Sequence, residues 1–392
     1  MSSANLVSLG DHISTQKGFA FKSSWYTSKG KAIVKVTNFT DSSIEHRELS
    51  YIPESVAAKY SKYALEDGDV VIQTVGSWPS NPASVVGKCI KVPQKVSGAL
   101  LNQNAVKVMP GATLDNSYLF YLLKDDRFKN YIVGTAQGAA SQAAITLDSI
   151  RAFKFPLTSL SHQRKIAGTL SSYDDLIENN MQRIGLLEEM ARLQYEYLKS
   201  KPEADDWDTM KLSDLCTTPR IAVMPANLES NTVYIGLEHI PRRSLAYSSY
   251  ASLDGVQSLK LKFESGDILF SKIRPYFHKV APAPVAGVAS SDTIIIRPIS
   301  REFYALVLLA VFSDDFTAKA VQSSNGTKMP RANWDVLKKY EIQIPNNEEL
   351  VRFNKFVMPI IDLIINLSRK NMTLKASRDL LLPRAISGEI EV

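Results

Sequence analysis

The sequence predicts an α+β protein made of two pseudo-repeated domains, each followed by a long helix, with the two helices paired as an antiparallel coiled coil. Three observations predict this fold: an internal duplication, strand-rich segments in both copies, and a heptad pattern that closes each copy. At 392 residues and 45% hydrophobic content, the chain exceeds one ordinary domain. We expect a first domain at residues 1–158, a central helix at 159–201, a second domain at 202–346 and a C-terminal helix at 347–392.

The duplication is visible in short motifs whose offset falls from 203 to 187 residues along the chain. Diverged copies with loop-length changes are expected to drift in this way. The matched segments are Val7–Asp11 with Met210–Asp214, Glu66–Val71 with Glu264–Leu269, and Asp148–Pro156 with Asp335–Pro345.

Each copy opens with a strand-rich region that an apolar helical stretch interrupts. In copy one we expect strands at Lys31–Thr37 and Asp69–Thr74, and in copy two Gly266–Lys272 and Asp292–Arg297 have the same roles. The apolar helical stretches are Tyr118–Leu123 and Tyr304–Phe312.

The segment that closes each copy carries apolar residues at heptad spacing, a narrower stripe than that of a globular surface helix. The first seam runs through Ile166, Leu170, Tyr173, Ile177, Asn180, Ile184 and Leu187. The second runs through Phe353, Val357, Ile360, Ile364, Leu367, Asn371 and Leu374, at a constant offset of 187. Because so narrow a seam needs a facing helix, we expect the two helices to pack on each other.

A pseudo-two-fold relation between the copies makes this pairing antiparallel. Setting paired residue numbers to sum to 551 places Ile166 opposite Ala385, and Asn180 opposite Asn371. A buried asparagine layer fixes register in coiled coils; the alternative is two unrelated asparagines that face solvent. The first seam continues through Ala191, Gln194 and Leu198, and the second through Arg378, Leu381 and Ala385, so each covers about 32 residues. At 1.5 Å per residue this is about 48 Å, more than one DNA turn of about 34 Å. That length suits a ligand with two separated patches.

Composition is compatible with a polyanionic partner without requiring one. The formal net charge is +6 and the pI is near 9.0, and residues 1–160 carry 17 Lys and Arg against 12 Asp and Glu. The two cysteines, Cys89 and Cys216, are far apart and match no disulfide or zinc pattern. With no signal-like start and no apolar run of membrane length, we expect a cytoplasmic protein without a membrane partner.

The sequence contains no motif for catalysis or metal binding. There is no GxxxxGK[ST] loop and no glycine-rich cofactor loop, and Asn81-Pro82 lacks the following proline and aromatic residue of a methyltransferase base-binding loop. The five histidines are scattered without metal-ligand spacing. The carboxylates of Glu66–Asp69 and Glu264–Asp267 resemble nuclease metal ligands, but a turn before an apolar strand explains them better. We therefore expect no enzyme, no metal and no bound cofactor.

The C-terminal run Leu380–Ile390 closely resembles the closing signature of Type I restriction-modification specificity subunits, which are bacterial DNA-recognition proteins. Pro156, His162–Ala167 and Leu176–Asn180 resemble that family's central region. The order of variable domain, helix, variable domain and helix covers essentially the whole chain. The second helix departs from the pattern, because Asn346–Leu350 and Phe353–Phe356 replace the usual Gln-Arg-Lys-Ile.

The resemblance implies that each variable domain is a target-recognition domain that reads one half of a gapped double-stranded DNA site. The helices would be a spacer and the platform for two methyltransferase subunits, with restriction subunits joining for cleavage. S-adenosylmethionine, ATP and Mg²⁺ would be bound by those partner subunits.

Several polar loop residues are candidates for DNA contact. Arg and Lys pair with guanine edges, Gln and Asn with adenine, and all of them can hold a phosphate instead. Ordinary solvated loop residues, or a structural role for His278, are the alternatives. The candidates are Lys17, Lys22, Ser77, Gln137 and Gln142 in copy one, and Lys272, Arg274, His278, Lys328 and Arg331 in copy two.

Two other functions stay open at this point. A DNA binder that acts alone, such as a repressor, would share the basic loops but would not need an exposed apolar strip on the helices. A self-contained nuclease or methyltransferase has no motif in its favour.

Overall fold

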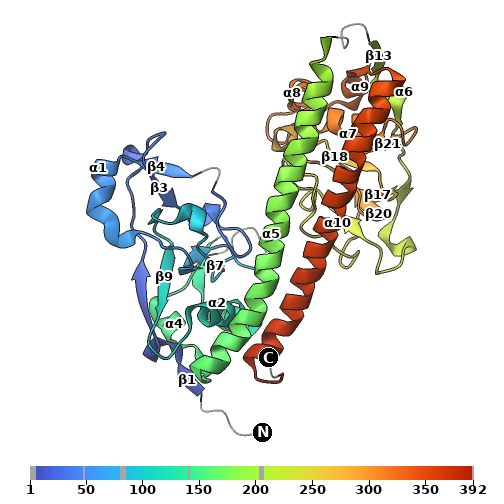
Figure 1. Ribbon diagram of the computed structural model, residues 1–392. Helices are drawn as coiled ribbons and strands as arrows, with labels where there is room; N and C mark the ends of the chain where they lie inside the picture. Colours follow the sequence, from blue (N-terminus) through green and yellow to red (C-terminus); the bar gives the residue numbers. More distant parts are fainter. Residues whose placement is uncertain (1–5, 47–48, 80–84, 140–141, 203–206, 391–392) are drawn as a thin grey trace. The chain divides into compact units, whose positions relative to one another are not determined.

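The computed structural model describes residues 6–46, 49–79, 85–139, 142–202 and 207–390 (Figure 1). The chain forms two compact units: unit 1 is residues 1–174 with 377–392, and unit 2 is residues 175–376. The division therefore passes through both long helices instead of separating them from the domains. It does so because each end of the helix pair is buried in the core of its own unit.

Unit 1 is built around a four-stranded sheet of order β2-β9-β5-β7. The helices α2 (Asn116–Lys124) and α3 (Asp126–Gly134) pack with it, and Asp115 caps α2 by accepting from the amides of Ser117 and Tyr118. The four strands are β2 (Ile13–Lys17), β9 (Ala105–Pro110), β5 (Val70–Gln73) and β7 (Cys89–Lys91). Smaller sheets join β4 (Ser50–Ile52), β3 (Lys31–Val34) and β8 (Leu100–Leu101), and pair β1 (Leu6–Ser8) with β12 (Lys154–Pro156). The short helices are α1 (Glu54–Ala57) and α4 (Leu147–Ala152).

Unit 2 repeats this arrangement with a four-stranded sheet of order β14-β21-β18-β19. The strands are β14 (Cys216–Thr217), β21 (Thr293–Pro298), β18 (Ile268–Ser271) and β19 (Val280–Pro282). A second sheet joins β15 (Ala222–Val223), β17 (Lys260–Phe263), β20 (Gly287–Ser290) and β16 (Tyr234–Ile235), and β13 (Asp208–Lys211) pairs with β22 (Glu341–Ile344). The helices are α6 (Leu212–Leu215), α7 (Tyr304–Val311), α8 (Asp314–Gln322) and α9 (Trp334–Leu337).

The topology confirms the duplication and corrects one strand assignment. Strand β18 is the counterpart of β5, as the Gly-Asp motif predicts, and α7 and α8 follow β21 as α2 and α3 follow β9. Strand β21, however, corresponds to β9 and not to Lys31–Thr37, because it lies between β14 and β18 as β9 lies between β2 and β5. The counterpart of β3 is β16, since each pairs in parallel with a later strand. The two segments look alike in the sequence because both are rich in apolar residues, and this feature does not distinguish one buried strand from another.

The two Gly-Asp turns have the same construction in both units. Asp69 accepts a hydrogen bond from the Glu66 amide at 2.7 Å, and Asp267 accepts one from the Glu264 amide at 2.7 Å. Gly68 and Gly266 have φ values of +80° and +90°, which glycine adopts without steric cost. Each aspartate also pairs with a cation on the neighbouring strand, Lys107 or Arg297. These carboxylates are therefore engaged in turn formation.

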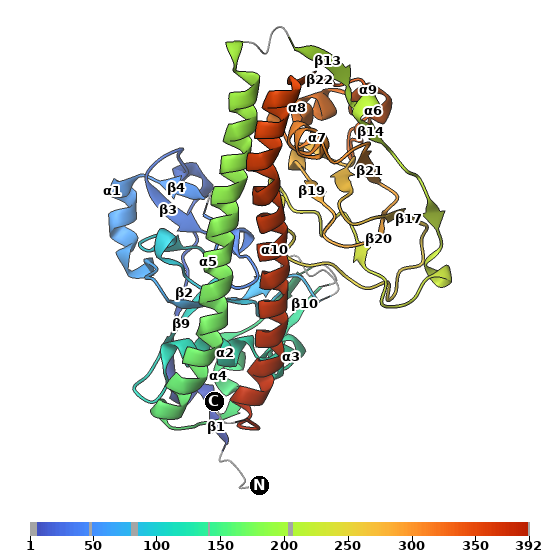
Figure 2. The same ribbon diagram turned by 45° about the vertical axis from the view of Figure 1, so that its right-hand side comes forward.

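Helix α5 (Leu160–Lys199) and helix α10 (Asn347–Ile386) run side by side in opposite directions (Figures 1 and 2). Ser159 and Asn346 begin them as N-caps, because their side-chain oxygens accept from the amides of His162 and Glu349. All twenty predicted seam positions are buried or half-buried. In unit 1 the start of α5 shares a core with the end of α10, and in unit 2 the end of α5 shares a core with the start of α10.

The predicted asparagine layer is present inside unit 2. Asn180 Nδ2 donates to Asn371 Oδ1 at 2.8 Å, and Asn371 Nδ2 donates to the Ile177 carbonyl at 3.4 Å. Asn180 is only 5% exposed. The antiparallel register that pairs residue numbers summing to 551 is thereby confirmed.

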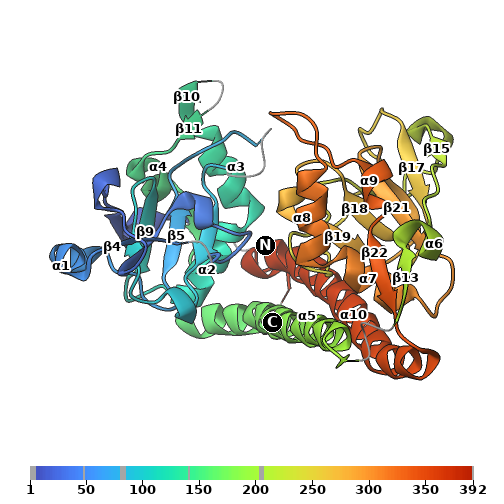
Figure 3. The same cartoon turned by 90° about the horizontal axis from the view of Figure 1, so that it is seen from above.

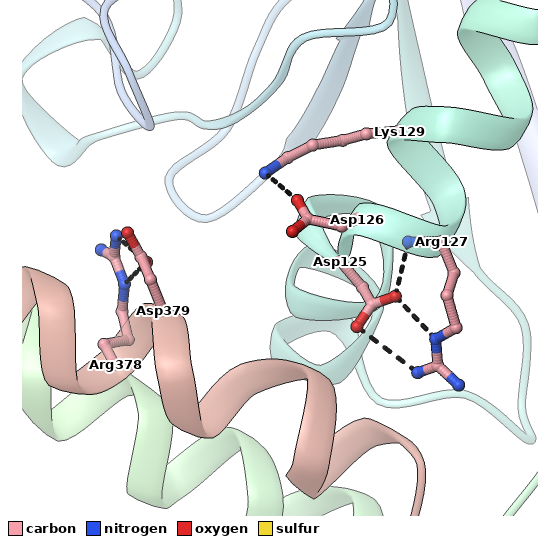
Figure 4. A network of polar contacts seen from close by, with 6 residues as sticks. All are labelled: Asp125, Asp126, Arg127, Lys129, Arg378 and Asp379. Atoms are coloured by element: carbon pink, nitrogen blue, oxygen red, sulfur yellow. Dashed lines mark hydrogen bonds and ion pairs between the residues drawn. The ribbon is translucent and has the colours of Figure 1, made fainter. Parts of the chain in front are cut away.

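A charged residue occupies the seam within unit 1. Arg378 is buried, and its guanidinium pairs with Asp379 (Figure 4). The guanidinium also pairs with Asp174 of α5, and the Tyr121 hydroxyl of α2 donates to Asp174 at 2.6 Å. The Arg378–Asp174 ion pair joins α10 to α5, and the hydrogen bond from Tyr121 joins this ion pair to α2. Removing one partner of such a buried pair is costly, because it leaves the other charge uncompensated.

Two expectations came from composition, one about the two cysteines and one about membrane-spanning helices. Cys89 and Cys216 are buried, and burial raises the pKa of each thiol to about 12, which keeps both protonated and unreactive at neutral pH. Among the described residues, no helix has both the length and the apolar character that crossing a membrane requires.

We predict that Asn180→Ala lowers the free energy of unfolding by about 1–3 kcal/mol, because Asn371 Oδ1 loses the hydrogen bond from Asn180 Nδ2 inside the seam. Urea denaturation followed by circular dichroism measures the change. Asn179→Ala is the matched control, since this exposed neighbour lies outside the seam, and it should change stability by less than about 0.5 kcal/mol. Equal effects of the two variants would contradict a structural role for the asparagine layer.

Candidate nucleic-acid interface

In unit 1 the fold brings together the two predicted segments that contain Ser77, Gln137 and Gln142. Strand β11 (Gln142–Ala144) pairs with β10 (Gln137–Ala139) on one side and with β6 (Val75–Gly76) on the other. Residues 140–141 of the predicted loop, and the Asn81-Pro82 motif, lie outside the described residues. Figure 3 shows β10 and β11 on the side of unit 1 that lies away from α5.

The sheet presents amide and hydroxyl groups. Gln137 and Gln142 are exposed and Ser77 is half-buried. The Ile145 amide donates to the Thr74 carbonyl at 2.9 Å, which ties the end of β11 to the residue that follows β5. The position of these side chains is therefore set by main-chain hydrogen bonds.

Lys17 and Lys22 belong to a different part of unit 1. Lys17 is the last residue of β2, and Lys22 lies with its ammonium 5.6 Å above the Trp25 ring. Trp25 packs with Phe19, Phe21 and Tyr60 in a small aromatic cluster. Both lysines are exposed, but no hydrogen bond or ion pair among the described residues joins them to the sheet that carries Gln137 and Gln142.

In unit 2 the corresponding two segments also meet. The Arg274 amide donates to the Pro330 carbonyl at 2.7 Å, and the Ala332 amide donates to the Lys272 carbonyl at 2.8 Å. These bonds join the β18–β19 connection to the segment between α8 and α9. In Figure 3 the latter segment reaches to the side of unit 2 that lies away from α10.

This junction in unit 2 is strongly basic. Lys272 and Arg331 both pair with Asp292, at 3.1 Å and 3.3 Å. Lys328 is exposed on the same segment as Arg331, and Arg274 is half-buried. The Arg274 Nε is enclosed and has no hydrogen-bond partner among the described residues.

The backbone around Arg274 is strained. Arg274 and His278 both have φ of +49°, and they flank a short 3-10 turn at Pro275–Phe277. Left-handed conformations of non-glycine residues cost of the order of 1–3 kcal/mol each and cluster at functional sites. The turn exposes Tyr276, whose ring lies 4.7 Å from that of Phe277, and Arg242 stacks on Phe277 at 3.8 Å.

The structure favours the structural alternative for His278. The side chain is 3% exposed, and Nε2 lies 2.8 Å from the Phe312 carbonyl. Burial lowers the pKa of the imidazole, so the neutral ring donates this hydrogen bond near pH 7. The burial of His278 contradicts the expected DNA-facing role, because almost none of the ring is presented at the surface.

Sequence reasoning missed three residues of this region: Asp292, Tyr276 and Arg242. Asp292 lies 20 residues after Lys272 and 39 before Arg331, so no local pattern marks it. Tyr276 stands between the selected residues Arg274 and His278, and the Arg-Pro-Tyr sequence was the available signal for an exposed aromatic at a turn.

Comparison with known proteins agrees with this architecture. The family model described as the Type I restriction modification DNA specificity domain matches residues 1–189 and 204–376. The specificity subunit of the Type I restriction enzyme MjaIX from Methanocaldococcus jannaschii is 24% identical over 74% of this chain and 73% of its own length. That of EcoDI from Escherichia coli is 28% identical over 38% of this chain and 34% of its own.

The fold is also similar to that of solved structures. The crystal structure of the Type I restriction-modification system S subunit from M. genitalium superposes with a TM-score of 0.57 at 14% identity, covering 98% of this chain and 97% of that chain. At this identity the similarity concerns the fold alone.

We predict that Gly138→Ala weakens sequence-specific DNA binding about tenfold or more, which corresponds to about 1.4 kcal/mol. A Cβ at Gly138 would lie 2.1 Å from the Gln142 carbonyl oxygen, and φ is +152°, so strands β10 and β11 must move apart. Gel-shift titration of the assembled complex measures the loss. Gly134→Ala is the matched control, because a Cβ there meets nothing within 4 Å and binding should be unchanged. Equal binding by both variants would exclude the β10–β11 pair from the interface.

Proposed function

The chain belongs to the Type I restriction-modification DNA specificity family, and we propose that it is the subunit that recognises a two-part, gapped DNA site for such a complex. The observation that carries this proposal is the repeated junction of two loop segments at the same place in each domain fold. The junction in unit 1 offers Ser77, Gln137 and Gln142. The junction in unit 2 offers Lys272, Arg274, Lys328 and Arg331, whose cationic side chains suit phosphates and guanine edges.

In this proposal the chain itself is non-catalytic. Methyltransferase subunits would bind S-adenosylmethionine, and restriction subunits would use ATP and Mg²⁺. Two observations support this division of labour: Asp69 and Asp267 are engaged in turns and ion pairs, and both thiols are held protonated by burial. The groups with the most catalytic character by sequence are thus committed to structure.

A row of exposed apolar side chains on the helix pair of unit 2 is the proposed platform for a methyltransferase subunit. Each of these residues directly precedes a seam residue, so in the antiparallel helix pair of unit 2 all of them lie on one face. We call this set the apolar ridge; it consists of Leu176, Leu186, Met190, Leu193 and Tyr197 of α5 with Phe356 and Leu363 of α10. A clustered apolar face of this kind marks an interaction surface.

The apolar ridge also separates the proposal from its main alternative, a DNA binder that acts alone. Such a protein has no use for seven exposed large apolar residues on one helical face, which would promote aggregation. A chain that assembles with two methyltransferase subunits buries that face.

Methylation mapping tests the proposed function. The full chain is co-expressed with its methyltransferase subunit, and methylated bases are mapped on genomic DNA with and without this chain. We expect a gapped, asymmetric, two-part motif that disappears when the chain is omitted. A continuous motif, or methylation that does not depend on this chain, would refute the proposal and favour the stand-alone binder.

We further predict that Leu193→Glu reduces co-purification of the methyltransferase subunit at least tenfold, because a charge must be desolvated in the contact. Leu193 is 52% exposed, so the fold should tolerate the change. Met181→Glu is the control: Met181 is 57% exposed on the same helix but follows a seam residue, so it lies off the apolar ridge. Retention of the subunit by Leu193→Glu would place the platform elsewhere.

A further inference from the structure

Asp292 holds the two basic segments of unit 2 together through its carboxylate. It precedes β21, and one oxygen accepts from Lys272 Nζ at 3.1 Å and from Arg331 Nε at 3.3 Å. The other oxygen accepts from Arg331 Nη2 at 3.5 Å. The Lys272 amide donates to the Asp292 carbonyl at 3.1 Å, so the carboxylate is fixed relative to both segments.

The bidentate pair leaves one edge of the Arg331 guanidinium free. A guanidinium has five N–H donors, and Asp292 uses only those on Nε and one on Nη2. The Arg331 side chain is 49% exposed, so the remaining donors on Nη1 and Nη2 are accessible. Two adjacent N–H groups on a planar fork match the O6 and N7 acceptors of guanine in the major groove.

A negative charge at this position is unfavourable for simple phosphate binding. Asp292 offsets one of the two positive charges it contacts and would repel the DNA backbone. Burial raises the pKa of Asp292, but hydrogen bonds from Arg331 and Lys272 outweigh it and leave the pKa below its ordinary value, so the group is ionised at neutral pH. A carboxylate kept here at an electrostatic cost is explained by geometry, because it restricts the rotamers of Arg331 before DNA binds.

Unit 1 has a different chemistry at the corresponding junction. Gln137 and Gln142 are neutral there, and an amide matches the N6 and N7 groups of adenine instead. The two units therefore present different hydrogen-bonding groups to the two halves of a site.

We propose that Asp292 is a positioning residue that fixes the free edge of Arg331 for a guanine, so that the half-site read by unit 2 contains a G·C pair at that position. The inference rests on the proposed function and deepens it, because it names the base that this site selects. It assigns Arg331 to base recognition and Asp292 to the orientation of Arg331.

The test measures base discrimination in the assembled complex. The full chain is co-expressed with its methyltransferase subunit, and methylation is compared between the intact motif and motifs with one substituted base pair. We expect Arg331→Ala and Arg331→Lys to lose roughly tenfold to a hundredfold discrimination at one G·C position in one half-site. Asp292→Asn should lose discrimination at the same position, and the double variant Asp292→Asn with Arg331→Ala should lose no more than Arg331→Ala alone.

Glu348→Gln is the matched control, because it removes a carboxylate that pairs with Arg352 at the exposed start of α10 and should leave the motif unchanged. If Asp292→Asn lowers methylation of all sites equally with the motif intact, its role is structural and the inference is overturned. If Asp292→Asn binds all DNA sequences more tightly, the inference is also overturned, because Asp292 would then only lower the positive charge of the site. Loss of any dependence on this chain would instead refute the proposed function, so the two failures are distinguishable. Arg331→Lys keeps the positive charge but lacks the two adjacent N–H groups of the guanidinium. If Asp292→Asn folds poorly, this variant still tests whether Arg331 reads a base.

Discussion

The fold is organised by the burial of one narrow apolar stripe on each long helix. A heptad seam on a 40-residue helix cannot be covered by a loop or a sheet, because only a facing helix offers complementary holes at the same spacing. Antiparallel pairing then makes the beginning of α5 and the end of α10 part of one core, and the end of α5 and the beginning of α10 part of the other. The asparagine pair selects one register, at some cost in stability.

Duplication keeps the strands and turns of the two units alike, whereas the side chains of their loops differ. The Gly-Asp turn recurs with the same backbone hydrogen bond, although the cation that pairs with the aspartate is Lys107 in one unit and Arg297 in the other. The junction of the two loop segments also recurs, but its side chains differ in kind. A framework held by main-chain hydrogen bonds permits this difference, because the fold does not depend on which side chains the loops carry.

The sequence predicted the parts of the structure that repeat and missed those that depend on long-range contacts. Heptad spacing over about 30 residues specified the helices and the partner of Asn180, because each additional match narrows the register. It could not place Asp292 beside Arg331, since nothing periodic links residues 39 positions apart. His278 was misassigned for a related reason: its basic neighbours suggested exposure, whereas burial is decided by Phe312 on a distant helix end.

The burial of His278 in turn explains how the site of unit 2 keeps its shape. A turn with left-handed residues at both ends relaxes unless other bonds oppose it. At one end the Arg274 amide is held by Pro330; at the other, the His278 carbonyl accepts from the Arg243 amide at 2.9 Å while its ring is fixed by Phe312. The strained backbone that orients Arg274 is thus maintained by a histidine that is itself 3% exposed. In unit 2 the residues proposed to contact DNA and the residues that hold them in place are different sets, and the sequence pattern revealed only the first set.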